Sequence, residues 1–250
     1  MSQRSTFALL LAAVAGSVDA IGYLTLAQLF IAHMSGNSVR VGIFIGERSW
    51  GAMFERAFPI PMLVLGVMAG AILTEVGLRR RVAATLSVML ALECLLLAAF
   101  ALFGRTLLVG GEIPPADGWR FYLAVALPTV ALGLQNAALR RVGGHTVRTT
   151  FVTGMLSDLA EAAVACGFWI RDAVAGGRAM ADVLRVLPDE ESLHRFALYS
   201  AIWLLYIAGA VCGTLVELRA LLNALAFPIA VLALLACWNL FRPILPPEPF

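Results

Sequence analysis

Long apolar runs recur along almost the whole chain, and they constrain the fold more than any other feature. A helix that crosses a membrane needs about 20 mostly apolar residues, because the hydrocarbon layer is about 30 Å thick. Runs of about this length lie at 6–26, 28–46, 58–78, 82–103, 120–140, 147–169, 196–217 and 220–241. We therefore expect an all-α, polytopic integral membrane protein embedded in the lipid bilayer.

Composition supports a membrane protein and argues against a soluble domain or a nucleic-acid-binding protein. Hydrophobic residues make up 61% of the chain and charged residues 14%, against about 25% charged in soluble domains. The net charge of +2, without a basic run interleaved with aromatic residues, argues against a nucleic-acid partner. We expect a single membrane domain over residues 1–242, followed by a proline-rich tail, 243–250.

A weak internal similarity suggests that the domain contains two copies of one unit, about 1–104 and 118–242. The matched features, in the same order in both halves, are GSVDA at 16–20 with GLQNA at 133–137, Ser35-Gly36 with Thr153-Gly154, and Gly66 and Gly70 with Gly209 and Gly213. Any one match is weak, because pairs of small residues four apart commonly mark close helix packing in membranes. Together the matches predict an internal repeat.

The positions of the arginines favour six full spans over eight. Basic residues concentrate in cytoplasmic loops, and eight spans would divide the loop arginines 10 to 7. If 28–46 and 147–169 instead enter the membrane and return, the division is 12 to 5, and both termini are cytoplasmic. The twelve are Arg4, Arg79, Arg80, Arg81, Arg140, Arg141, Arg148, Arg171, Arg178, Arg185, Arg195 and Arg242.

Three crossings per copy would insert the second copy upside down relative to the first. Inverted repeats with interrupted helices near the middle of the bilayer are the architecture of many secondary transporters. Interrupted backbone at that depth is tolerated only against protein or a water-filled cavity. We therefore expect 28–46 and 147–169 to be interrupted or re-entrant segments.

The first of these segments contains HMSGNSVRVG, residues 33–42, a polar stretch between apolar residues. Gly36 supplies backbone freedom for an interruption, while Ser35 and Asn37 can satisfy freed backbone groups or bind a ligand. His33 can titrate near neutral pH. This stretch is the first half of the candidate substrate site.

The second segment carries Thr153 and Gly154 at the matching place. Four residues after each glycine stands a charge, Arg40 in one copy and Asp158 in the other. We expect these opposite charges to face each other at the middle of the membrane, because an unpaired charge there costs at least about 2.5–3.5 kcal/mol. They would form either a site for a polar solute or ion, or a salt bridge that stabilises the fold.

Two further carboxyl groups lie inside apolar runs. Asp19 has the neutral Asn136 as its counterpart, an arrangement that suits a protonatable or cation-coordinating position, or equally an interhelical hydrogen bond. Glu93 lies near the middle of 82–103, where we expect its carboxyl group to be protonated or paired.

No cofactor or metal is predicted. His33 and His145 lack further ligands at helical spacing, and no cysteines are paired as CxxC. A serine hydrolase would need a base and an oxyanion pocket, whereas the sequence shows only a histidine and a serine near each other in the chain. We expect the protein not to be an enzyme.

Two segments of the chain together resemble the YoaK-like family of bacterial membrane proteins, a domain of unknown function. They are GSVDAIGYLTLAQLFIAHMSGNSVRVG and GLQNAALRRVGGHTVRTTFVTGMLSDLA. The similarity covers nearly the whole chain, although Ser35 stands where the family pattern leads us to expect threonine. The resemblance implies an inner-membrane protein with about six helices. It implies no substrate, cofactor or catalytic residue.

The leading functional hypothesis is a secondary transporter or permease-like protein for a small polar solute or ion. A channel of the same architecture, or a membrane scaffold in which the polar groups serve packing, are the alternatives, and a homo-oligomer is left open. The predicted substrate-binding residues are Asp19, His33, Ser35, Gly36, Asn37, Arg40, Asn136, Thr153, Gly154 and Asp158.

Overall fold

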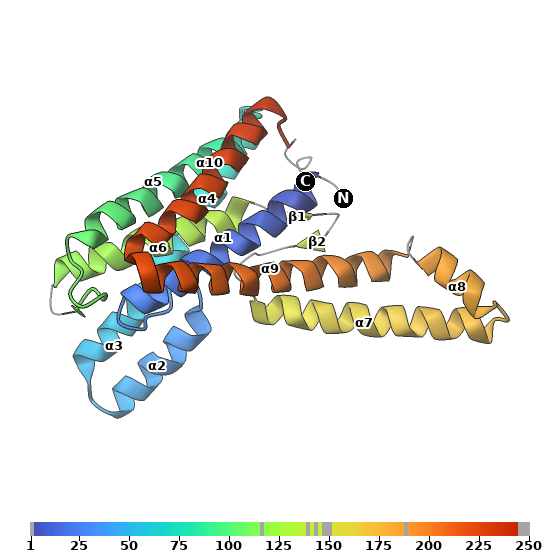
Figure 1. Ribbon diagram of the computed structural model, residues 1–250, viewed down its shortest axis with the longest axis horizontal. Helices are drawn as coiled ribbons and strands as arrows, with labels where there is room; N and C mark the ends of the chain where they lie inside the picture. The colour runs from blue at the N-terminus through green and yellow to red at the C-terminus, as the bar shows by residue number, and fades with distance from the viewer. Residues whose placement is uncertain are drawn as a thin grey trace.

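The computed structural model describes residues 3–115, 118–138, 141–142, 145–146, 152–187 and 190–244, which are mostly helical. Figure 1 shows a bundle of helices from which a long helical hairpin projects. The first half contains α1 (Gln3–Thr25), α2 (Met34–Gly46), α3 (Trp50–Ala57), α4 (Pro59–Arg79) and α5 (Thr85–Arg105). The second half contains α6 (Trp119–Ala138), β1 (Arg141–Val142), β2 (His145–Thr146), α7 (Val152–Ala175), α8 (Met180–Val186), α9 (Glu191–Ala220), the 3-10 helix η3 (Leu221–Leu225) and α10 (Ala226–Phe241). Apart from the short antiparallel pair β1–β2, the all-α prediction is confirmed for the described residues.

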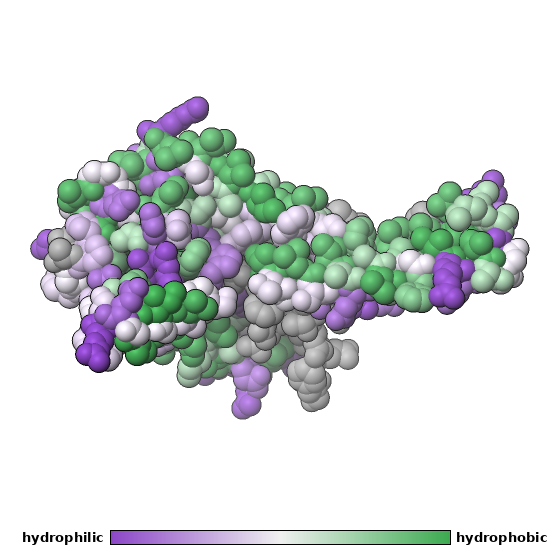
Figure 2. Space-filling model, turned by 90° about the horizontal axis from the view of Figure 1, so that it is seen from below, coloured by the Kyte–Doolittle hydropathy of each residue, from purple (hydrophilic) through white to green (hydrophobic). Residues whose placement is uncertain are grey.

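Several helices are long and apolar enough to cross a membrane. Within the described residues these stretches are 3–25, 50–79, 85–105, 119–138 and 191–241. The last contains α9, η3 and α10, because the chain turns at Leu221, where φ is 51°. The outer surfaces of these helices carry apolar side chains: Leu102 of α5 is 66% exposed and Leu234 of α10 is 70% exposed. Figure 2 shows hydrophobic residues over much of one face, including the projecting hairpin, as expected for a surface covered by lipid.

The interruption predicted in 28–46 lies earlier than expected. Residues 26–33 are not helical, and α2 begins at Met34, so that Gly36 lies in its first turn. Gly36 instead lies close to Phe30, because a Cβ atom there would lie 3.2 Å from the ring. Of the second predicted segment, 147–151 lies outside the described residues, and Gly154 lies in the first turn of α7.

Glycines bring α1 and α9 into close contact. Gly209 of α9 lies against the backbone of Ala13, and a Cβ atom at Gly213 would come within 2.7 Å of the hydroxyl oxygen of Ser17. Residue numbers rise together along the two helices, so α1 and α9 run parallel, as Figure 1 shows. Small residues permit this approach of two backbones, as predicted for these glycines.

The same kind of contact joins α4 to α6. Gly66 of α4 lies against the backbone of Val130, and a Cβ atom at Gly70 would come within 3.2 Å of the carbonyl oxygen of Leu134. Residue numbers again rise together, so these two helices also run parallel.

The two interfaces correspond residue by residue. The contacting residues of α1 lie 117 positions before those of α6 (13 to 130, 17 to 134), and the glycines of α4 lie 143 positions before those of α9 (66 to 209, 70 to 213). Two more contacts are related by the same two shifts. Gly16 touches the carbonyl of Tyr206, and Gly133, 117 positions after Gly16, touches the carbonyl of Leu63, 143 positions before Tyr206.

The helices α5 and α10 run antiparallel. The hydroxyl of Ser87 donates a hydrogen bond to the carbonyl of Ala236 at 3.0 Å, and the thiol of Cys94 donates to the carbonyl of Ile229 at 3.6 Å. The two contacts also correspond to each other. The α10 residue of each contact lies 142 positions after the α5 residue of the other contact (94 to 236, 87 to 229).

The beginning and end of the described chain lie together. The side chain of Gln3 donates a hydrogen bond to the carbonyl of Arg242 at 2.8 Å. Two hairpins leave the bundle: α2 with α3, between α1 and α4, and α7 with the first part of α9, after α6. Figure 1 shows them at different ends of the bundle.

Candidate functional site around Asp19

Residues 26–33, which connect α1 to α2, form an unusual turn that carries part of the site. Ala27 and Gln28 have φ angles of 49° and 55°, in the left-handed region that residues other than glycine rarely adopt. Arg56 of α3 donates a hydrogen bond to the carbonyl of Ala27, and Arg40 of α2 donates one to the carbonyl of Gln28, both at 2.9 Å. These charge-assisted bonds hold the connection in a conformation that costs energy to adopt.

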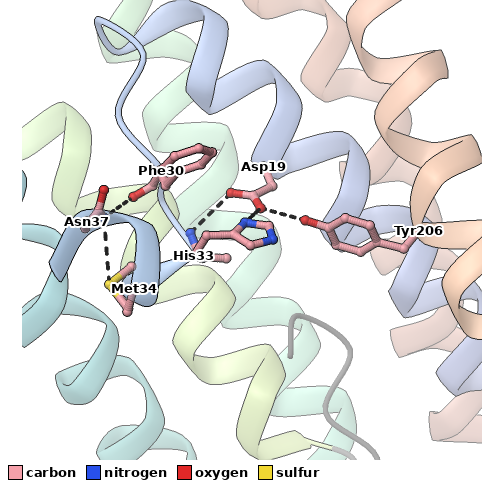
Figure 3. Close-up of polar contacts among 7 residues, drawn as sticks. Asp19, Phe30, His33, Met34, Asn37 and Tyr206 are labelled. Carbon is pink, nitrogen blue, oxygen red and sulfur yellow. Dashed lines mark hydrogen bonds and ion pairs between the residues drawn. The ribbon is translucent and has the colours of Figure 1, made fainter. Parts of the chain in front are cut away.

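The carboxylate of Asp19 is the centre of the site. It is 5% exposed. Figure 3 shows it contacted by side chains and backbone of two other elements. The backbone N–H of Ala32 donates to Oδ1 at 3.2 Å, and the Tyr206 hydroxyl of α9 donates to Oδ2 at 2.6 Å. Nδ1 of His33 lies 2.6 Å from the same Oδ2, the distance of an ion pair. The cluster therefore joins α1, the 26–33 connection and α9.

Aromatic rings surround this polar cluster. The ring centroids of Phe30 and His33 are 5.6 Å apart, and those of His33 and Tyr206 are 6.1 Å apart, both edge to face. Tyr23 packs on the other side of Phe30, with ring centroids 4.8 Å apart. Electrostatic interactions of a buried group such as the Asp19 carboxylate are stronger than in water, because the local dielectric constant is lower.

His33 lies between the candidate spans, and its pKa is raised above the ordinary value of 6.5. The main cause is the bond to the Asp19 carboxylate, and the negative charge of Asp19 adds to it, while partial burial acts in the opposite direction. A raised pKa favours the protonated imidazole near neutral pH.

The polar stretch after His33 stabilises the connection. Asn37 is fully buried, and its side-chain N–H donates to the carbonyl of Phe30 at 2.6 Å. Gly36 leaves room for the Phe30 ring, whereas the side chain of Ser35 is exposed. Of the residues predicted here, the structure places His33 against Asp19 and gives Asn37 a supporting position.

The expected pairing of Arg40 with Asp158 is wrong. Among the described residues, ion pairs join His33 to Asp19 and Arg79 to Glu75. Arg40 bonds the connection beside it, whereas Asp158 lies half-buried on α7, near Tyr199 of α9. The physical reason is that α7 packs along α9 while α2 packs near α4, so the two charges belong to separate hairpins.

The other predicted residues lie outside the cluster. Asn136 is half-buried on α6, and Thr153 is exposed at the start of α7, next to the half-buried Gly154. The structure therefore does not gather the ten predicted residues into one site.

Sequence reasoning missed Tyr206, which contributes the third contact to Asp19. Its only signal was its place three residues before Gly209, within a run predicted to pack closely. A second polar link between α1 and α9 was also missed: the hydroxyl of Thr25 donates to the buried Glu217 carboxylate at 3.1 Å. Neither partner could be found from sequence spacing.

Glu93 of α5 is 1% exposed, and its Oε1 atom has no hydrogen-bond partner in the described part of the protein. Such a group is costly to bury, and most buried polar atoms in proteins are bonded. Also within the described residues, no group of three or more His, Cys, Asp or Glu side chains is placed to hold a metal ion.

Long apolar helices with lipid-compatible surfaces and a buried ionisable cluster define a multi-pass α-helical membrane protein. Residues 7–238 match the family described as "Protein of unknown function (DUF1275)", and the chain belongs to that family. It is similar to the UPF0700 transmembrane protein YoaK of Bacillus subtilis (strain 168), with 28% identity over 158 residues, which are 63% of this chain and 66% of YoaK. The resemblance noted from the sequence is thereby confirmed. No solved structure matches the chain.

Proposed function

We propose that α1, α4, α5, α6, α9 and α10 each cross the bilayer once, while α2 and α7 do not. The hydrogen bond between Gln3 and Arg242 supports an even number of crossings, because the two ends of the described chain lie on one face. Six crossings also agree with the division of the arginines between the two faces.

Helix directions support six spans rather than eight. With six, α1, α5 and α9 cross in one direction and α4, α6 and α10 in the other. This fits the parallel pairs α1–α9 and α4–α6 and the antiparallel pair α5–α10. If α2 and α7 also crossed, α5 and α10 would have to run parallel, contrary to their contacts.

The same topology makes the two halves inverted copies, 1–104 and 118–242. The first helices of the halves, α1 and α6, cross in opposite directions. Each packs against the second crossing helix of the other half, α1 against α9 and α6 against α4, through glycines at corresponding positions. The constant shifts of 117 and 143 positions between these contacts support the repeat.

On this architecture, the protein is a secondary transporter or permease-like protein for a small polar solute or ion. The observation that carries this proposal is the buried Asp19 carboxylate, held from one side by His33 and from the other by Tyr206. Ionisable groups inside membrane proteins commonly mark ion or substrate pathways. Loss of the His33 proton would weaken the link between the 26–33 connection and the bundle, and so couple a proton to movement.

The location that follows is a bacterial inner membrane with both termini in the cytoplasm. The basic run Arg79–Arg81 begins at the last residue of α4, which on this topology ends on the same face as the termini. Basic residues are retained on the cytoplasmic side of membrane proteins.

Ligand-induced stabilisation of the purified protein tests the function. Melting temperatures are measured in detergent against a panel of amino acids, carboxylates, sugars, nucleosides and inorganic ions. A solute present at about 100 times its Kd stabilises the folded state by about 2.7 kcal/mol. We expect at least one solute to raise the melting temperature of the wild type, and Asp19→Asn to abolish that rise.

Glu75→Gln is the matched control, because Glu75 is a carboxylate of the same helical bundle but is exposed and forms an ion pair with Arg79. It should respond to the solute as the wild type does. Uptake of the hit into proteoliposomes then separates the alternatives: a transporter shows saturation and counterflow, whereas a channel does not. A scaffold is indicated if no solute stabilises the wild type or crosses the vesicle membrane.

A further inference from the structure

Two arginines converge on the turn that follows α1. Nη1 of Arg40 bonds the carbonyl of Gln28, and Nη2 of Arg56 bonds the carbonyl of Ala27. These carbonyls belong to consecutive residues, and the charge of Arg40 acts on Arg56, so the two guanidinium groups, from α2 and α3, lie near each other. Each group uses one of its five N–H donors in this way.

Arg56 keeps donors that the protein does not satisfy. Its Nε and Nη1 atoms are buried and have no hydrogen-bond partner among the described residues. Most buried donors in proteins are satisfied, so unused donors on a charged group call for an explanation. A ligand that accepts hydrogen bonds would supply the missing partner.

The charges around Arg56 are also unbalanced. The charged or titratable side chains that act on it electrostatically are Arg40, its sequence neighbour Glu55, and Tyr23 of α1. Neither Arg40 nor Arg56 forms an ion pair with an acid in the described parts of the chain. Two like charges held together repel each other, and an anion between them would offset this repulsion.

We propose that Arg40 and Arg56, with Tyr23 beside them, bind the oxygens of a phosphate group. Guanidinium groups suit this ligand because they carry several N–H donors in a planar fork that matches its geometry. The phosphate belongs either to a lipid headgroup or to a free phosphate in solution. The site goes beyond the transport proposal, since it requires neither a particular substrate nor movement.

Its place in the fold suits a phosphate from either source. The two arginines lie just beyond the last residue of α1, Thr25, where a crossing helix leaves the hydrocarbon layer. Lipid phosphates lie in this boundary region, and dissolved anions reach it from the water. The hairpin of α2 and α3 brings both arginines to this level.

The test measures melting temperatures of the wild type and the double variant Arg40→Gln/Arg56→Gln. Each is titrated with sodium phosphate against sodium chloride of equal ionic strength. In a second series, the micelles contain either phosphatidylglycerol or the phosphate-free lipid monoglucosyl diacylglycerol. Arg79→Gln is the matched control, because Arg79 is exposed and already pairs with Glu75.

We expect one of the two phosphate probes to stabilise the wild type and Arg79→Gln, and to bind the double variant at least about tenfold more weakly. Stabilisation by sodium phosphate identifies a free phosphate as the ligand, and stabilisation by phosphatidylglycerol alone identifies a lipid. The proposal is overturned if neither probe stabilises the wild type, or if the double variant responds as the wild type does.

If the double variant fails to fold, Arg56→Lys replaces it, because lysine keeps the charge but lacks the guanidinium fork. Weaker binding of the phosphate probe by Arg56→Lys than by Arg79→Gln supports the site. Equal binding by these two variants excludes it.

Discussion

The hydroxyl of Tyr206 donates a 2.6 Å hydrogen bond to the carboxylate of Asp19, although 187 residues separate the two in sequence. The bond crosses the interface at which Gly16, Gly209 and their neighbours bring α1 and α9 into backbone contact. The glycines make the approach possible, and the polar pair adds a hydrogen bond across it. His33 then attaches the 26–33 connection to the same carboxylate.

Replacing Tyr206 with phenylalanine removes this hydrogen bond and keeps the ring. Hydrogen bonds to charged groups contribute about 1.5–3 kcal/mol, so we expect Tyr206→Phe to lower the free energy of unfolding by about that amount. Denaturant unfolding in detergent measures the change. The control is Tyr122→Phe, whose ring packs against Phe54 and Phe58. Equal effects of the two substitutions would contradict the role given to the Tyr206 hydroxyl.

Stability should fall as pH rises through the titration of His33. Because the folded-state pKa is raised above 6.5, the His33–Asp19 pair contributes fully below the unfolded value and is lost above the folded one. Melting temperatures between about pH 5 and about pH 9 should therefore fall more steeply for the wild type than for His33→Gln. His194→Gln, at an exposed histidine of α9, should retain the wild-type slope. Parallel curves for the wild type and His33→Gln would refute this linkage.

The interhelical glycines can be tested with single methyl groups. A Cβ atom at Gly209 would press on the backbone of Ala13, which cannot give way as a side chain could. We expect Gly209→Ala and its counterpart Gly66→Ala each to lose about 1–3 kcal/mol of stability through overpacking. Gly167 of α7 has no atom within 4 Å of such a Cβ, so Gly167→Ala should be neutral or gain up to about 1 kcal/mol. Losses as large at Gly167 would show that the contacts are not responsible.

Six spans predict the sides on which two loops lie. A side-specific reporter in the loop at Arg79–Arg81 should face the cytoplasm, and one at Arg219 should face the opposite side. Enzymatic or chemical labelling of intact cells, with lysed cells as the control, measures this. Finding both reporters on one side would favour eight spans and would remove the inverted repeat from the proposal.

Replacing each of the buried glutamates Glu217 and Glu93 with leucine should have different effects on stability. Glu217 accepts a hydrogen bond from Thr25, so Glu217→Leu leaves a buried hydroxyl without its partner and should cost about 1–3 kcal/mol. Glu93 has an unbonded Oε1 in an apolar setting, so Glu93→Leu should be neutral or stabilising. Thermal unfolding of both variants decides the matter. A large loss in Glu93→Leu would reveal a partner or function of Glu93.

The candidate site shows where sequence reasoning stopped. His33 and Asp19 were both predicted as site residues, because polar groups within apolar runs stand out in a sequence. Their common partner Tyr206 was not predicted, and the expected pair of Arg40 with Asp158 was wrong. The sequence shows the polarity and charge of each residue, but the residue's partner depends on which helices pack together.

By itself, the sequence determined that this is a helical membrane protein with polar groups among apolar helices. In hydrocarbon, every backbone N–H and C=O must be bonded within the protein, so apolar runs of this length can only become helices. Only the tertiary structure decided that α1 lies beside α9 and α4 beside α6. Those pairings rest on small residues fitting between backbones at specific points, which is a property of two surfaces together and cannot be read from either one.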